Sequence, residues 1–89
     1  MDIYQHIEIE RNKAKQLKRT QWWKSQKGMG KCHYCQERFD PKILTMDHKV
    51  PISRGGKSTK KNLVPCCQEC NQKKKYLTSE EWAAHIKQD

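Results

Sequence analysis

The sequence predicts a small α+β domain that is held together by a metal ion and flanked by helices. Four of its five cysteines form two C-x-x-C pairs, and 31 residues lie between the pairs. Two short stretches between the pairs have the residue types of strands, and an apolar stripe with helical spacing lies near the N-terminus. The chain has 89 residues, of which 34% are hydrophobic. A core of that size gives little stability by itself, so a metal ion or disulfides are expected.

The first segment, residues 1–27, is expected to be a basic helical extension. The apolar positions on one stripe of this helix are Ile3, Ile7, Ala14 and Leu17. Gly28-Met29-Gly30 ends the segment. Trp22 and Trp23 have two interpretations, because they can stack on bases or pack onto the rest of the domain. Packing is the favoured one.

The charge is strongly basic, with 19 Lys and Arg against 10 Asp and Glu, a net charge of +9. The excess lies in residues 1–66. A field of this sign attracts polyanions, and nucleic acid is the commonest of them. The alternative is a basic protein whose charges are only solvated. The side chains expected to contact nucleic acid are Arg11, Lys15, Lys18, Arg19, Arg54, Lys57, Lys60 and Lys61.

No apolar run approaches the ~18–20 residues of a membrane span. The N-terminus also lacks the apolar stretch of a cleavable signal peptide. Five cysteines are an odd number, and without a secretory signal they argue against a disulfide framework. We therefore expect an intracellular, cytoplasmic protein that binds no membrane.

The cysteine spacing indicates a structural zinc site. The expected ligands are Cys32, Cys35, Cys67 and Cys70. Each C-x-x-C turn presents two thiolates, and two turns complete a tetrahedral zinc site. One such pair alone can be redox-active, but two pairs in a chain this small favour zinc. Cys66 is left over because its spacing to the last cysteine is wrong for a knuckle, and His33 is not assigned as a ligand.

Two other motifs are excluded. The pattern Cys32-x2-Cys35-x12-His48 begins like a C2H2 zinc finger, but no second histidine follows at positions 52–54. Gly56-Lys57-Ser58 ends like a P-loop, but Pro51 stands where that motif needs a glycine.

The 31 residues between the cysteine pairs exceed the ~15–20 of a simple zinc ribbon, so something further is mounted on the zinc. The expected elements are a strand over residues 43–50, a flexible loop over 53–58, a strand over 62–65 that the proline stops, and helices over 67–76 and 77–89. Thr78 and Glu81 form a capping box for the last helix, which turns Trp82 and Ile86 toward the core.

The ordered combination of these motifs resembles the HNH endonuclease family. The matching segments are Cys32-His33-Tyr34-Cys35, Leu44-Thr45-Met46-Asp47-His48-Lys49-Val50-Pro51, Ser53-Arg54-Gly55-Gly56, Asn62-Leu63-Val64 and Cys67-Gln68-Glu69-Cys70-Asn71. The resemblance implies a ββα core over residues 31–76, within a single domain of residues 1–89. It also implies that this core binds one catalytic metal ion.

The resemblance further implies a role for each site residue. Asp47 is a metal ligand, His48 is the general base, and Asn62 orients the hairpin and the base. Asn71 is the second protein ligand, at a place where many members have a third histidine. The implied reaction hydrolyses DNA phosphodiester bonds to 5′-phosphate and 3′-hydroxyl ends.

The chemistry of these residues supports such a reaction without the family name. A neutral imidazole with a pKa near ~6.5 can accept a proton from water at pH 7, which suits His48. Oxygen ligands from Asp47 and Asn71 suit Mg²⁺ or Mn²⁺. Adjacent residues on a regular strand point to opposite faces, so a twist or bulge is expected to bring Asp47 and His48 to one site.

Each site residue also has a structural alternative. His48 can be a solvated strand-end histidine, Asp47 a turn acceptor, Asn62 the start of a strand, and Asn71 a polar helix residue. Two functions remain: a metal-dependent DNA endonuclease or nickase, and a non-catalytic zinc module that binds nucleic acid or protein. The four residues together favour the enzyme. Binding to DNA is expected to be mostly non-specific, with any sequence preference slight or supplied by a protein partner.

Overall fold

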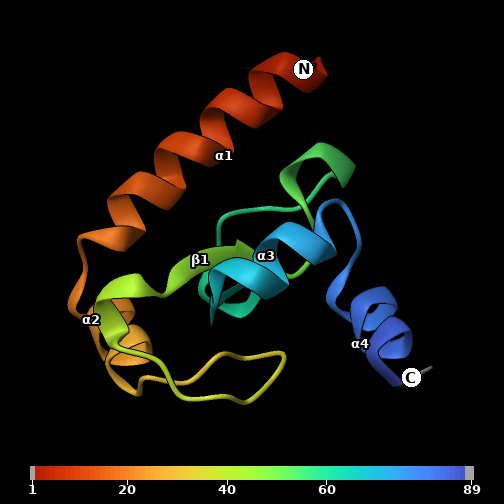
Figure 1. Cartoon of the computed structure of the whole chain (residues 1–89). Helices are drawn as coiled ribbons and strands as arrows, with labels where there is room; N and C mark the ends of the chain where they lie inside the picture. The colour runs from red at the N-terminus through yellow and green to blue at the C-terminus, as the bar shows by residue number, and fades with distance from the viewer. Residues whose placement is uncertain (1, 88–89) are drawn as a thin grey trace.

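Helices surround a two-stranded antiparallel hairpin in the computed structural model, which describes residues 2–87 (Figure 1). The helices within this range are α1 (Ile3–Lys18), α2 (Gln21–Gly28), α3 (Gln68–Lys74) and α4 (Ser79–Lys87). The strands are β1 (Thr45–His48) and β2 (Leu63–Cys66). The predicted α+β class is therefore confirmed. Within the described residues, no helix is long and apolar enough to cross a bilayer.

The N-terminal segment forms two helices where a single helical segment was predicted. Asp2 begins α1 with a capping box, in which its side chain accepts a hydrogen bond from the Gln5 backbone N–H at 2.8 Å. Thr20 separates the helices, since its hydroxyl donates to the Leu17 carbonyl at 2.6 Å and accepts from the Trp23 N–H at 3.3 Å. One side chain thus ends α1 and caps α2.

The predicted apolar stripe of α1 is only partly buried. Ala14 is buried, but Ile3 is 47% exposed. The position between Ile7 and Ala14 on the same stripe is Glu10, which is buried. A charged residue therefore lies where helical spacing would place an apolar one.

The hairpin is shorter than the sequence predicted and is regularly paired. Thr45 lies opposite Cys66 and His48 lies opposite Leu63. β1 begins at Thr45 because a 3-10 turn occupies Pro41–Ile43. β2 continues through Pro65, which was expected to stop it. Both strands of a two-stranded sheet are edge strands, and an edge strand tolerates proline.

The core is centred on the cysteines, and α4 covers it. Trp82 is buried against the cluster that contains Cys32, Leu44 and Cys66. The predicted capping box of α4 is present, because Thr78 and Glu81 exchange backbone-to-side-chain hydrogen bonds of 2.9 and 3.2 Å. Cys67 and Cys70 belong to the same buried cluster as Trp82. Ile86, expected in the core, is exposed instead.

Candidate functional site

Four cysteines come together as one candidate metal site. They are Cys32, Cys35, Cys67 and Cys70, whose Sγ atoms all lie within 4.8 Å of one another. A tetrahedral zinc ion with Zn–S bonds of ~2.3 Å needs sulfur atoms about 3.8 Å apart. The arrangement therefore fits a structural zinc ion. Cys66 lies outside this group, and its buried thiol donates to the Cys67 carbonyl at 3.3 Å.

Local backbone geometry prepares this site for thiolates. Gln36, with a φ of 64°, turns the chain after the first pair, and its N–H donates to the Cys32 carbonyl at 3.1 Å. Cys67 is the N-cap of α3 and accepts from the Cys70 N–H at 3.4 Å. Burial raises the pKa of the Cys32 thiol, but backbone hydrogen bonds outweigh it and lower this pKa to about 7. Burial raises the pKa of Cys70, so a bound cation is needed to keep that sulfur ionised.

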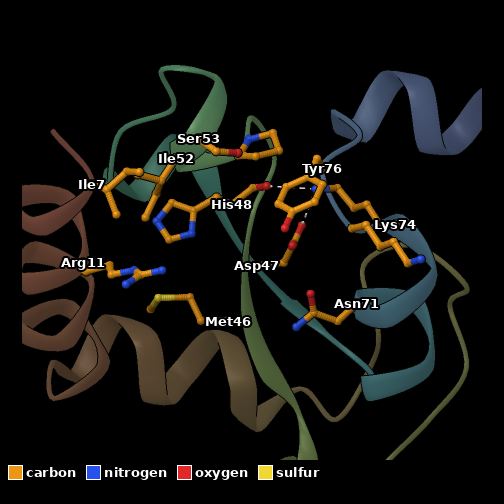
Figure 2. A pocket seen from close by; sticks show the side chains of 12 residues that line it. Ile7, Arg11, Met46, Asp47, His48, Ile52, Ser53, Asn71, Lys74 and Tyr76 are labelled. Carbon is orange, nitrogen blue, oxygen red and sulfur yellow. Dashed lines mark hydrogen bonds and ion pairs between the residues drawn. The ribbon is translucent and has the colours of Figure 1, made fainter. Parts of the chain in front are cut away.

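A second candidate site is a cleft of about 260 Å³ between α1, the end of β1 and α3 (Figure 2). Its lining includes Arg11, Asp47, His48, Asn71, Lys74 and Tyr76. Three of the residues that the sequence singled out for chemistry, from β1 and α3, thus face one space. The strand is in register through Asp47 and His48, so they reach the cleft without a bulge.

Asp47 is buried, and one of its carboxylate oxygens is fully engaged. Oδ2 accepts a hydrogen bond from the Tyr34 hydroxyl at 2.6 Å and lies 3.2 Å from the Lys74 ammonium. Burial raises the pKa of Tyr34, and the carboxylate of Asp47 raises it further, so the hydroxyl stays a donor. Among the described residues, no hydrogen bond reaches Oδ1. This oxygen is available to a cation in the cleft.

The amide of Asn71 is oriented by a neighbouring hydroxyl. Thr45 donates its only hydroxyl proton to the Cys66 carbonyl at 2.9 Å, so its Oγ1 accepts from Asn71 Nδ2 at 3.1 Å. The amide oxygen of Asn71 is thereby turned to the side of Asp47 (Figure 2). Two oxygen donors, one charged and one neutral, suit a hard divalent cation such as Mg²⁺ or Mn²⁺.

His48 is half-buried at the end of β1. Burial lowers its pKa, although the charge of Asp47 acts in the opposite direction. The lowered pKa favours the neutral imidazole near pH 7, which is the form that can accept a proton. The ring nitrogen Nε2 lies 2.9 Å from the Ser58 hydroxyl.

Asn62 closes the base of the loop between the two strands. Its side chain accepts from the Val50 N–H at 2.9 Å and donates to the carbonyls of Val50 and Lys57 at 3.1 and 2.8 Å. This loop was expected to be flexible, but it is anchored. A Cβ on Gly56 would lie 1.8 Å from the Val50 carbonyl oxygen, so only glycine fits, and Ser58 is buried.

The basic residues predicted to bind nucleic acid occupy different surroundings. Arg11 lines the cleft, and Lys18 lines a second hollow that shares Met46 and Asn71 with it. Arg54 instead forms an ion pair with the carboxylate of Glu81. The other residues predicted to bind nucleic acid are all exposed, and they are Lys15, Arg19, Lys57, Lys60 and Lys61.

The tryptophan pair mainly packs. Trp23 is buried, as the favoured interpretation predicted. Trp22 is half-buried, and the Lys60 ammonium lies 5.7 Å from the centre of its ring, a cation–π contact.

Several site residues escaped the sequence analysis. Two had a local signal: Tyr34 lies inside the first C-x-x-C, and Lys74 follows Asn71 by three residues, almost one helical turn. Glu10 interrupts the apolar stripe of α1, which was a third signal. Ser58 had none. The additional lysines of the second hollow are Lys24 and Lys27.

A β-hairpin followed by a helix, with the two strand-end residues and the helix asparagine around one cleft, defines a ββα-metal domain. The family model of the HNH endonuclease matches residues 32–76, half of the chain, and the protein belongs to this family. The family consists of nucleases, which implies a nucleic-acid substrate. A comparison with curated proteins found no match.

Proposed function

We propose that the protein is a divalent-metal-dependent endonuclease that hydrolyses DNA phosphodiester bonds and leaves 5′-phosphate and 3′-hydroxyl ends. The observation that carries this proposal is the convergence of three groups on one cleft: the His48 imidazole, the free Asp47 oxygen and the Asn71 amide oxygen. A module that only binds nucleic acid does not need a base beside two oriented oxygen ligands.

His48 acts as the general base in this proposal. Its neutral imidazole removes a proton from a water molecule in the cleft, and the resulting hydroxide attacks the phosphorus of the scissile phosphate. Burial supports this role, because it lowers the pKa of His48 and keeps the imidazole neutral at pH 7. Asn62 contributes indirectly, because it fixes the loop that begins directly after the strand of His48.

Asp47 and Asn71 would together hold a single Mg²⁺ or Mn²⁺ ion. Such an ion, when bound, stabilises negative charge on the non-bridging and departing oxygens of the phosphate. The protein contributes the orientation of both ligands, since Tyr34 and Lys74 hold Asp47 and Thr45 holds Asn71. Because Oδ2 of Asp47 is already engaged, the carboxylate offers the ion one oxygen.

The DNA backbone is proposed to run across the two adjoining hollows. A strand that places its scissile phosphate beside His48 passes Asn71 and Met46 and enters the hollow lined by α2. Among the described residues, no acidic side chain lines that second hollow, so it attracts neighbouring phosphates. The cations along this path include Arg11, Lys18, Lys24, Lys27 and Lys75.

The remaining predicted contacts are secondary in this proposal. Arg54 already pairs with Glu81 and Lys60 lies over Trp22, so both must break an internal interaction to reach a phosphate. Contacts to phosphates carry no sequence information, so binding is mostly non-specific. Any strong sequence preference would then come from a protein partner.

The direct test is incubation of the zinc-loaded protein with supercoiled plasmid in Mg²⁺, in Mn²⁺ and without added divalent ions. The proposal predicts nicked or linear DNA only with Mg²⁺ or Mn²⁺, and ends that a polymerase extends without prior phosphatase treatment. Zinc is measured in every sample, so that loss of the structural ion is not mistaken for loss of the catalytic one. DNA binding without cleavage in either metal would instead support a non-catalytic zinc module.

A further inference from the structure

We propose that Ser58 and Glu10 are positioning residues that fix the orientation and tautomer of His48, so that helix α1 forms part of the active site. This inference rests on the proposed role of His48 as general base. It adds two supporting residues for His48. Neither lies on β1 or α3, the strand and helix that carry the proposed metal ligands.

The hydrogen bonds around Ser58 leave its hydroxyl a single role toward His48. Its Oγ donates to the Glu10 backbone carbonyl at 2.5 Å. A hydroxyl has one proton, so the same oxygen can only accept from His48 Nε2, which lies 2.9 Å away. The proton of the neutral imidazole is therefore on Nε2, and the lone pair is on Nδ1.

This tautomer leaves the basic nitrogen where the reaction needs it. Figure 2 shows one ring nitrogen of His48 on the side of α1 and the other on the side of Asp47 and Asn71. Because Nε2 is held by Ser58, the nitrogen beside the proposed metal ligands is Nδ1. A water molecule between these groups would meet a lone pair and not an N–H.

Glu10 fixes Ser58 at two points. Besides the carbonyl that accepts the hydroxyl proton, its carboxylate accepts the Ser58 backbone N–H at 2.6 Å. Glu10 is 4% exposed and Ser58 is 6% exposed, so water does not compete for these bonds. A buried carboxylate with a specific backbone partner accounts for the charged residue on the apolar stripe of α1.

A second contact pins the same loop to the same helix. His6, one turn before Glu10, has its Nε2 atom 3.1 Å from the Gly56 carbonyl oxygen. The loop that holds Ser58 is thus attached to α1 at two successive turns. Helix α1 lies outside residues 32–76, which match the family model, so this chain supplies the support of its base from its own N-terminal extension.

The first test is the tautomer of His48 in the zinc-loaded protein without added Mg²⁺ or Mn²⁺, read from the ¹⁵N chemical shifts of its ring. We expect Nε2 protonated and Nδ1 unprotonated in the wild type, and a mixture of tautomers in Ser58→Ala. Thr59→Ala is the matched control, since this neighbouring hydroxyl is exposed and caps nothing. A protonated Nδ1 in the wild type, or an unchanged ring in Ser58→Ala, would overturn the proposal.

The second test is cleavage kinetics. Residues that orient metal-bound histidines typically affect activity 10- to 100-fold, and by analogy kcat in Ser58→Ala should fall by about that factor with little change in KM. Glu10→Ala should also lower kcat, whereas Glu8→Ala, an exposed glutamate on the same helix, should not. Melting temperature and zinc content show whether each variant is folded. An unchanged kcat in folded Ser58→Ala contradicts the inference.

The two proposals fail in different ways. If His48→Ala cleaves DNA as fast as the wild type, His48 is not the base and the proposed function is wrong. If His48→Ala is inactive while Ser58→Ala keeps both the tautomer and kcat of the wild type, only the positioning role is wrong. The ring shifts are measured without any cleavage reaction, so they report on Ser58 in either case.

Discussion

Lys74 and Asp47 form a buried ion pair at the centre of the candidate active site. The ammonium lies 3.2 Å from Asp47 Oδ2, and the two side chains are 1% and 9% exposed. Lys74 also donates to the His48 backbone carbonyl at 3.0 Å, as the dashed lines of Figure 2 show. One lysine of α3 therefore neutralises the proposed metal ligand and holds the strand end that carries the proposed base.

Replacement of this lysine should expose its electrostatic role. Lys74→Met leaves a buried carboxylate without its cation, and removal of one partner of a buried pair typically costs about 3–5 kcal/mol. We expect a loss of that order in the free energy of unfolding without added divalent ions. The loss should shrink with Mg²⁺ or Mn²⁺, because a cation at Asp47 replaces the missing charge.

Chemical denaturation of the zinc-loaded protein measures this effect. Lys73→Met is the control, because Lys73 is exposed and its ion pair with Glu69 joins two exposed groups on one helix. Such exposed pairs contribute little to stability, so the control should lose much less than Lys74→Met. Equal losses in the two variants would contradict the role of Lys74.

The zinc site yields a prediction with an internal control. Cys35→Ser and Cys70→Ser should lose zinc and fold poorly, because binding energy at such a site is folding energy. Cys66→Ser should retain one zinc ion per chain, since its sulfur lies outside the group of four. Elemental analysis of the purified variants decides the matter. Retention of zinc by Cys35→Ser or Cys70→Ser, or its loss from Cys66→Ser, would count against the assigned ligands.

Glu10 should make stability depend on pH in the acid range. The Ser58 backbone N–H lowers the pKa of the Glu10 carboxyl below its ordinary value of 4.5. A lowered folded-state pKa means that the stabilisation is fully present above the unfolded pKa and is lost as the pH falls through the folded pKa. The wild type should therefore be more stable than Glu10→Gln at pH 5–7, and the difference should decrease below about pH 4.5.

Thermal melts of both proteins between pH 3 and 7 test this. Their difference cancels the acid loss of zinc, which affects both alike. Glu8→Gln serves as the control because Glu8 is exposed on the same helix. A constant difference between the wild type and Glu10→Gln over the whole range would refute the assigned linkage.

The proposed path of DNA predicts which lysines control its affinity. Replacing Lys24 and Lys27 by Gln should weaken binding and reduce the slope of log K against log salt by about 0.9 for each phosphate that the variant no longer neutralises. The same change at Lys31 and Lys42 is a matched control, since these exposed lysines line neither of the two adjoining hollows. An equal effect of both pairs would mean that only total charge matters.

Charge substitutions separate binding from folding better than removal of the first helix. Deletion of residues 1–20 would take away Arg11 and Lys18, but also Glu10 and its bonds to Ser58. A truncated protein would therefore lose the support of His48 together with the basic surface.

The sequence predicted those parts of the molecule that local patterns encode. The spacing of the cysteines identified the four sulfur atoms that meet, and the strand, strand, helix order followed from residue types between them. The division of the first segment at Thr20 was missed, although Thr is a common N-cap residue and its hydroxyl caps the next helix. The prediction that residues 53–58 form a flexible loop was wrong. Glycine was interpreted as a sign of conformational freedom, whereas Gly56 is required because the neighbouring backbone packs too closely for a side chain.

The contacts that complete the candidate active site could not be inferred from the sequence. Ser58 and Glu10 are 48 positions apart, and only the packing of α1 against the loop brings them together. Lys74 is one of three consecutive lysines, and both it and Lys75 follow Asn71 by about one helical turn, so this spacing alone does not identify the one that is buried. Local patterns indicated the reacting groups, whereas the residues that orient them depend on tertiary structure.

The central claim is that His48 is the base of a metal-dependent nuclease, and the rate of plasmid cleavage by His48→Ala tests it most directly. His85→Ala is the control, because His85 is exposed on α4 and stacks on Trp82, and it does not line the cleft. With zinc content and DNA affinity unchanged, His48→Ala should cleave supercoiled plasmid at least ~10²-fold more slowly than the wild type in Mg²⁺ or Mn²⁺. His85→Ala should cleave at the wild-type rate. Cleavage by His48→Ala at the rate of the wild type would contradict the claim.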